Sequence, residues 1–150
     1  MAFTGSYVCT TFATKLLAAQ INSTDTFRLA LYDSTATLTD ATTAYTATGE
    51  LATAGGYTAG GATTTMTIST ASTSNGTVVI VDFSDVNWVA ATFTCRGAML
   101  YDDTAAGNPA MLIMDFGTNK SPVAATFTVT FPAATANAGM CVFQSVLTNP

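Results

Sequence analysis

Apolar and polar positions alternate with a period of two over most of this chain, which is typical of half-buried β-strands. In 26–32 two leucines and Phe27 share one face, and in 126–131 phenylalanine and valine alternate strictly with threonine. The runs 77–83 and 110–116 are almost continuously apolar, so we expect them to lie centrally with both faces covered. Strands are therefore predicted at 26–32, 63–69, 77–83, 92–101, 110–116, 126–131 and 140–146.

Only one segment has a helical period. Within 8–20, Phe12 and Leu16 lie four residues apart on a narrow apolar stripe, which predicts about three helical turns. Turns rich in glycine, asparagine and aspartate separate the later strands. This order of elements predicts a mainly β fold, namely an antiparallel β-sandwich or barrel of about seven to eight strands with one short N-terminal helix.

The length of 150 residues suits one domain that can bury a core without metals or disulfides. We therefore expect a single β-rich domain over residues 1–150. It would begin with an N-terminal arm and helix (1–22) and contain an extended segment rich in glycine and threonine (35–62), which has few large apolar residues.

The composition changes the picture of the surface. Charged residues make up only 9% of the chain, whereas 31 residues are threonine. Threonine favours strands and keeps an exposed face wet without charge. Such a surface suits a chain that neighbouring subunits cover, so we expect a homo-oligomer; the alternative is a β-protein with a threonine-biased exterior.

Several partners are excluded by charge and hydropathy. The four cations, Lys15, Arg28, Arg96 and Lys120, are scattered, so no basic stripe is present and nucleic-acid binding is not expected. No apolar run is long enough for a transmembrane helix, and the first residues do not match a signal peptide. We expect no membrane partner and a protein that is made in the cytoplasm.

The thiols give no metal or catalytic pattern. The three cysteines fit no zinc spacing, and the chain contains no histidine. We expect reduced, buried thiols, with one disulfide as the alternative. A cysteine nucleophile would also lack its ordinary base.

The glycine-rich segment raises the question of a phosphate loop. A phosphate-binding loop needs a Lys and a following helix, or a dinucleotide pattern with a downstream acid, and this segment has neither. Glycine pairs flank Tyr57-Thr58 on both sides, at 55–56 and 60–61. We therefore expect an arm with glycine hinges that lies along a neighbouring subunit, with Tyr57 as its aromatic anchor.

The carboxylates are expected to be structural. Asp102 and Asp103 form the only adjacent acidic pair and are interpreted as a solvated turn, because too few oxygen ligands surround them for Ca²⁺. Asp82 and Asp115 end apolar strands and would accept hydrogen bonds from backbone amides or arginine. Arg96 within its strand would need a carboxylate or carbonyl partner. We identify no catalytic residue, cofactor site or metal site, and expect no enzyme.

Six stretches occur together in a characteristic order: MAFTGSYVCTTFATKLL, DTFRLALYDSTATLTDATTAYTATGE, GGYTAGG, VDFSDVNWVAATFTCRGAMLYDDT, LIMDFGTNKS and TFTVTFP. From Met1 to about Pro132 the chain thereby resembles a family of small tailed-bacteriophage proteins encoded among virion structural genes. The residues after Pro132 match the pattern less clearly. The resemblance implies a virion component without enzymatic activity.

Our leading hypothesis is a capsid decoration (cement) protein that binds the outer face of the major capsid shell. A head–tail adaptor, tail or fibre-attachment component is the alternative within the virion. Partners would be the major capsid protein or other copies of this chain. The candidate subunit-contact residues are aromatic: Phe3, Tyr7, Tyr45, Tyr57 and Trp88, although Trp88 also fits a core position.

A hypothesis of another class is a carbohydrate- or surface-binding module. Its stacking platform would be Trp88, Tyr32 or Tyr101. Exposed aromatic side chains on a β-scaffold suit this role, so it requires that these rings reach the surface.

Overall fold

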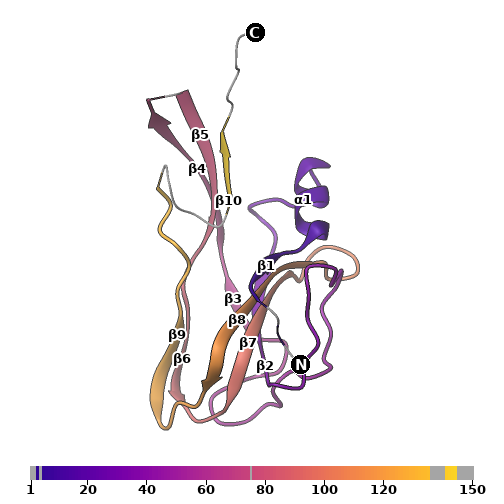
Figure 1. Cartoon of the computed structure of the whole chain (residues 1–150), viewed down its shortest axis with the longest axis vertical. Coiled ribbons are helices and arrows are strands. Elements are labelled where there is room, and N and C mark those ends of the chain that lie inside the picture. Colours follow the sequence, from indigo (N-terminus) through magenta and orange to yellow (C-terminus); the bar gives the residue numbers. More distant parts are fainter. Residues whose placement is uncertain (1–2, 4, 75, 136–140, 145–150) are drawn as a thin grey trace.

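The computed structural model describes Phe3 and residues 5–74, 76–135 and 141–144, the last of these as backbone (Figure 1). Ten strands and one short helix account for the regular structure of these residues. The chain is mainly β with antiparallel sheets, as the period-two pattern predicts.

One layer is a five-stranded sheet in the order β1-β8-β7-β2-β3, in which every pair is antiparallel. Its strands are β1 (Tyr7–Val8), β2 (Phe27–Tyr32), β3 (Ala62–Thr64), β7 (Cys95–Asp102) and β8 (Ala110–Lys120). The helix α1 (Thr10–Leu17) follows β1 directly.

The facing layer consists of two smaller antiparallel sheets, β10-β5-β4 and β6-β9. Their strands are β4 (Met66–Thr73), β5 (Gly76–Phe83), β6 (Val86–Ala91), β9 (Ala125–Val129) and β10 (Cys141–Gln144). The chain passes between layers at Thr65, beside a bond of 2.6 Å from Thr64 Oγ1 to the Ser84 carbonyl. The result is a sandwich (Figure 1).

The main core fills the space between the two layers. Phe27, Leu29 and Leu100 of the five-stranded sheet are fully buried against Phe83 and Trp88 of the facing layer. The rings of Phe27 and Phe83 meet edge-on with centroids 5.2 Å apart. Burial of each such side chain contributes roughly 1.5–3 kcal/mol, so this interior dominates the stability of the fold.

A second cluster covers the outer face of the five-stranded sheet. Tyr32 and Met99 point to this side, where Phe3 of the N-terminal segment and Ala36 and Leu38 of the 35–62 segment pack on them. The two segments therefore act as a third layer. This arrangement explains why β2 and β7 are buried almost throughout.

Most predicted strands are present within a few residues of their expected bounds. The expected 63–69 strand is two strands, because Thr65 carries the chain from one layer to the other. The helix is shorter than 8–20, since Val8 pairs with Leu112 in β1. The end of the expected 140–146 strand lies outside the described residues.

Two expectations about strands were incomplete. β6 was not predicted, because 86–91 contains one polar residue, Asn87, and therefore shows no sustained alternation. β5 is central in its sheet as expected, whereas β8 is not, since only the two-residue β1 lies beyond it. Both faces of β8 are nevertheless covered at its start, where Met111 enters the main core and Ile113 the outer cluster.

The β4–β5 hairpin extends past the rest of the sandwich, on the side of the molecule where α1 lies (Figure 1). From Thr67 to Thr73 every β4 residue is exposed or half-buried. Val79 of β5 is also exposed, by 39%, whereas Val78 and Ile80 are buried. This hairpin is therefore the part of the described chain that offers most strand surface to solvent.

Candidate functional site

The aromatic residues that sequence reasoning selected for subunit contacts are mostly inside the protein. Phe3, Tyr57 and Trp88 are 4%, 2% and 5% exposed, so the expectation that they anchor a neighbouring subunit is wrong for this fold. Tyr7 and Tyr45 are half-buried, against the outer cluster. Trp88 instead packs with Phe93 and Phe127 of its own chain, which is the core role that its position also suggested.

The glycine-rich segment is folded against its own domain and does not form a free arm. Its centre is the Glu50 carboxylate, whose Oε1 accepts hydrogen bonds from the Tyr57 hydroxyl and the Gly60 amide, both at 2.6 Å. The other oxygen accepts a short bond from the Tyr45 hydroxyl. The Tyr57 hydroxyl in turn accepts the Leu31 amide at 3.0 Å. A half-buried carboxylate with three hydrogen-bond donors thus fixes a segment that the composition suggested would be mobile.

Glu50 lies where the two cores meet at the edge of the five-stranded sheet. It forms an isolated bridge with Tyr32, the last residue of β2. Tyr45 belongs to the outer cluster and stacks on Tyr101 with centroids 4.5 Å apart, whereas Tyr57 belongs to the main core. The sole glutamate of the chain therefore connects the third layer to the interior.

Burial controls the ionisation of these tyrosines. Desolvation, followed by the charge of Glu50, raises the pKa of Tyr32 well above its ordinary value. Desolvation and then the hydrogen bond to Glu50 raise the pKa of Tyr45 and that of Tyr57 in the same direction. These three phenols therefore stay protonated near neutral pH, and each donates its proton to a fixed acceptor. We interpret the tyrosines around Glu50 as a structural anchor.

The carbohydrate-binding hypothesis loses its platform. Trp88, Tyr32 and Tyr101 are all buried, at 5%, 0% and 2% exposure. The Tyr101 hydroxyl donates to the Gly60 carbonyl at 2.7 Å. A sugar could not stack on any of the three rings without unfolding the layer above it, so this module is not proposed further.

The carboxylates are structural, with one correction. Arg96 donates to both oxygens of Asp115, at 2.9 and 3.3 Å, so each residue has one of the kinds of partner that were expected for it. Asp102 is fully buried and does not lie in a solvated turn; its Oδ1 caps the amides of Thr104 and Ala105. The outer member of the acidic pair, Asp103, forms an ion pair of 2.8 Å with a β2 arginine.

Two carboxylate oxygens, Asp82 Oδ1 and Asp102 Oδ2, are buried without a hydrogen-bond partner among the described residues. For Asp82 this differs from the expected bond to a backbone amide or arginine. Neither atom belongs to a metal site: across residues 5–74 and 76–135, no group of three or more acidic or cysteine side chains could hold an ion.

The thiols of Cys9 and Cys95 are free and buried, as expected. Burial, reinforced by Asp40, raises the pKa of the Cys9 thiol to about 11, and burial raises that of Cys95 to about 12. Both thiols therefore stay protonated and unreactive at neutral pH. The side chain of Cys141 lies outside the described residues.

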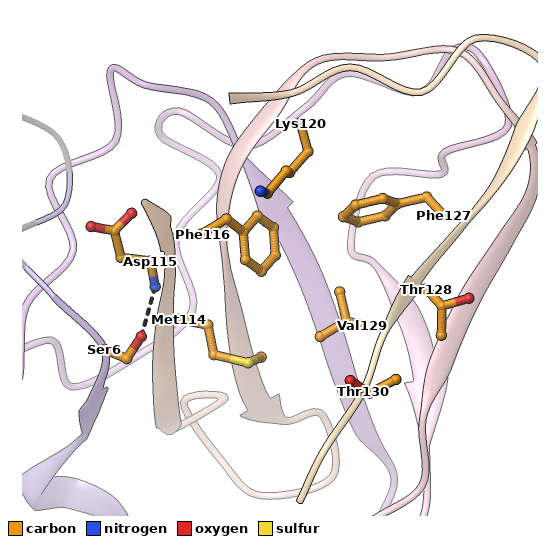
Figure 2. Close-up of a pocket in the computed structure, with 9 residues that line it drawn as sticks. All are labelled: Ser6, Met114, Asp115, Phe116, Lys120, Phe127, Thr128, Val129 and Thr130. Carbon is orange, nitrogen blue, oxygen red and sulfur yellow. Dashed lines mark hydrogen bonds between the residues drawn. The ribbon is translucent and has the colours of Figure 1, made fainter. Parts of the chain in front are cut away.

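A pocket of about 320 Å³ opens between β8 and β9 (Figure 2). Phe116 and Phe127 meet there edge-on at 5.9 Å, with Met114 and Val129 below them and Lys120 at the rim. The Asp115 side chain points away, and its backbone amide donates a hydrogen bond of 3.0 Å to Ser6 Oγ. One cation above apolar walls can hold an amphipathic group, but it offers no pair of groups for proton transfer.

A second hollow, of about 260 Å³, has a wholly apolar lining and lies between α1 and the β4–β5 hairpin. We call it the α1 groove; it is lined by Leu16, Leu17, Ile68, Val79 and Val81. Leu17 is 81% exposed and Ile68 is 52% exposed. Apolar side chains gathered at one exposed place mark interaction sites, so the α1 groove is the candidate contact surface.

Sequence reasoning missed this groove. Leu17 lies beside the predicted helix stripe, and Ile68 is a single large apolar residue in a run of serine and threonine. Each would be unremarkable alone, and only the fold brings them together. The nearest signal in the sequence was that Leu17 falls outside the stripe that α1 buries.

Comparison with known proteins gives no relative: no family model, curated protein or solved structure matches this chain. Within the described part of the chain, no helix is long and apolar enough to cross a membrane. The functional argument therefore depends on the residues and surfaces described above.

Proposed function

We propose that this chain is a non-enzymatic structural protein of a bacteriophage virion, present in many copies as a decoration protein on the outer face of the capsid shell. The resemblance of its sequence to small tailed-phage virion proteins supports the phage assignment. The observation that carries the role of an assembled subunit is the α1 groove beside the uncharged strand β4.

The energetics favour a contact that is weak in one subunit and becomes stable when many copies bind together. Burying Leu17 and Ile68 against a partner gains roughly 1.5–3 kcal/mol for each fully covered side chain. Part of this is offset by the loss of translational and rotational freedom on association. A single contact of this kind is weak, but repetition over a symmetric shell makes the whole layer stable.

Copy number is the primary test. Quantitative mass spectrometry of purified virions should give copies on the order of hundreds, as expected for a layer that follows the symmetry of the shell. A density map of the particle should place the protein on the outer shell surface. About a dozen copies or fewer would rule out the decoration role.

The groove itself can be tested by rebinding. Purified wild-type protein and Leu17→Ser would be added to capsids that lack it, and bound protein measured by sedimentation. The matched control is Val123→Ser, because Val123 is also exposed, at 76%, but lies in the β8–β9 connection away from the groove. We expect Leu17→Ser to bind at least about tenfold more weakly, for the loss of roughly 1.4 kcal/mol, and the control to bind normally. Equal binding of both variants would show that the groove is not the contact.

The projecting hairpin favours a second candidate, a head–tail or tail component in which hairpins of neighbouring subunits meet around a ring. A ring has a small, fixed number of subunits at one position on the particle. The same copy-number measurement and particle map therefore separate this role from decoration.

A further inference from the structure

The free edge of β4 has features of a pairing surface. β4 pairs with β5 from Met66–Phe83 to Thr73–Gly76 without any register shift, and it is the last strand of its sheet. Its exposed part, 67–73, contains no charge and no proline. From Met66 to Ser72, no described strand pairs with the outer side of β4.

The edges of the five-stranded sheet are blunted in ordinary ways. β1 and β3, the edges of the large sheet, are two and three residues long. The part of β8 beyond β1 carries Asp115 and Lys120 and a register shift. Short edges, charges and bulges are the devices that prevent edge-to-edge association, and β4 uses none of them.

We propose that β4 pairs with β4 of a second copy of this chain, antiparallel and about a twofold axis perpendicular to the sheet. The distribution of charge favours a second copy as the partner. The chain carries a net charge of −5, but 67–73 is uncharged, so two identical chains can pair here without like-charge repulsion between the strands. The joined sheet has the order β10-β5-β4-β4-β5-β10. Pairing uses up the free β4 edge of both copies, so this contact joins two chains and cannot extend to a third.

The geometry fixes what the centre of the dimer looks like. Residues directly opposite each other in an antiparallel pair share a face, and the perpendicular twofold axis keeps each residue on its own face. The residue numbers of two paired positions are therefore both odd or both even. It follows that one residue lies on the axis and pairs with the same residue of the other copy. Full overlap of 67–73 places Thr70 on the axis, with Ile68 opposite Ser72 of the other copy.

The same axis brings the two α1 grooves to one side of the joined sheet. Ile68 pairs with Val81 and Thr70 with Val79, so these four residues share the groove face. A dimer would thus present two apolar grooves in one direction. The pairing itself is independent of the virion role and is tested on the isolated full-length protein, so either idea can fail alone.

A charge swap at the axis is the decisive experiment. Analytical ultracentrifugation should find a concentration-dependent dimer for the wild type. Thr70→Lys and Thr70→Asp should each remain monomeric, with dimer affinity reduced at least about tenfold, because like charges directly opposite each other repel. An equimolar mixture of the two variants should dimerise again. Thr77→Lys is the matched control, since Thr77 is exposed on the same hairpin but lies on β5, and it should dimerise normally.

Disulfide trapping checks the register. In a Cys141→Ser background, where Cys9 and Cys95 are buried, Thr70→Cys should cross-link at least about tenfold faster than Ser69→Cys or Ala71→Cys, because only opposed Cβ atoms reach disulfide distance. Fastest trapping at Ile68 or Ser72 would support the pairing with a shifted axis. A monomer at every concentration, or a dimer lost in Leu17→Ser but kept in Thr70→Lys, would overturn the proposal.

Discussion

Removal of the Glu50 carboxylate tests whether one residue holds the third layer on the sandwich. The carboxylate accepts the Tyr57 hydroxyl and the Gly60 amide at 2.6 Å each, and a short bond from Tyr45. Glu50→Ala leaves the first two donors without an acceptor in a part-buried site. Glu50→Gln keeps an acceptor oxygen in place but removes its charge.

The expected magnitudes follow from these bonds. An unsatisfied buried donor costs about 1–3 kcal/mol, so two of them reduce the free energy of unfolding by about 2–6 kcal/mol in Glu50→Ala. Glu50→Gln should cost about 2 kcal/mol, because two charge-assisted bonds each lose about 1 kcal/mol. Tyr45→Phe should cost less than about 1 kcal/mol, since water can reach the oxygen that it vacates.

Urea denaturation followed by tryptophan fluorescence measures these differences, because Trp88 lies in the same core as Tyr57. The dependence of the unfolding free energy on urea concentration should keep the same slope in all variants. The urea midpoint should fall least in Tyr45→Phe, more in Glu50→Gln and most in Glu50→Ala. A Glu50→Ala protein within about 0.5 kcal/mol of the wild type would refute the reasoning, as that is the range of ordinary surface substitutions.

Three further outcomes are expected. Gly61→Ala should destabilise the protein by about 1–3 kcal/mol more than Gly107→Ala in thermal unfolding. Both glycines have φ near +80°, so the backbone strain is similar. A Cβ at Gly61 would lie 2.1 Å from a β2 carbonyl oxygen, whereas a Cβ at Gly107 would meet nothing within 4 Å. The arginine beside Asp115 lowers the pKa of that carboxyl below 3.8. The stabilisation by this ion pair is therefore present above about pH 4 and is lost as the pH falls through the folded-state pKa. Asp115→Asn should reduce the loss of stability at acid pH, and an unchanged loss would contradict the ion pair. Cys9 and Cys95 should not react with a thiol reagent at pH of about 8 until urea unfolds the chain, and rapid reaction of either in the native protein would show that its burial is wrong.

Much of the sandwich could be predicted from the sequence because its signals are local. In 126–131 the alternation of apolar residues with threonine marks which face is buried, and Val129 and Phe131 are indeed buried while Thr128 and Thr130 are exposed. The alternation can be recognised without knowing which strands lie beside it, because the apolar positions within one strand already mark its buried face. The kind of partner that Arg96 needs could be predicted in the same way, because a cation inside a strand requires a nearby carboxylate or carbonyl oxygen. The pairing of β7 with β8 decided that this partner is Asp115.

The position of the 35–62 segment was decided only by tertiary structure. Its glycines and threonines predict conformational freedom, and by themselves they fit a mobile arm. In the folded chain, Glu50 finds donors that come from both sides of it in the sequence, and Tyr57 finds Trp88 and Phe93 of a distant strand and loop. A carboxylate that is withdrawn from water even in part needs such donors around it, and those donors are assembled by the fold. The sequence by itself determined most of the strands and their buried faces. The tertiary contacts turned a segment that its composition leaves free into a layer that covers the five-stranded sheet, and they left Leu17 of α1 and most of β4 exposed.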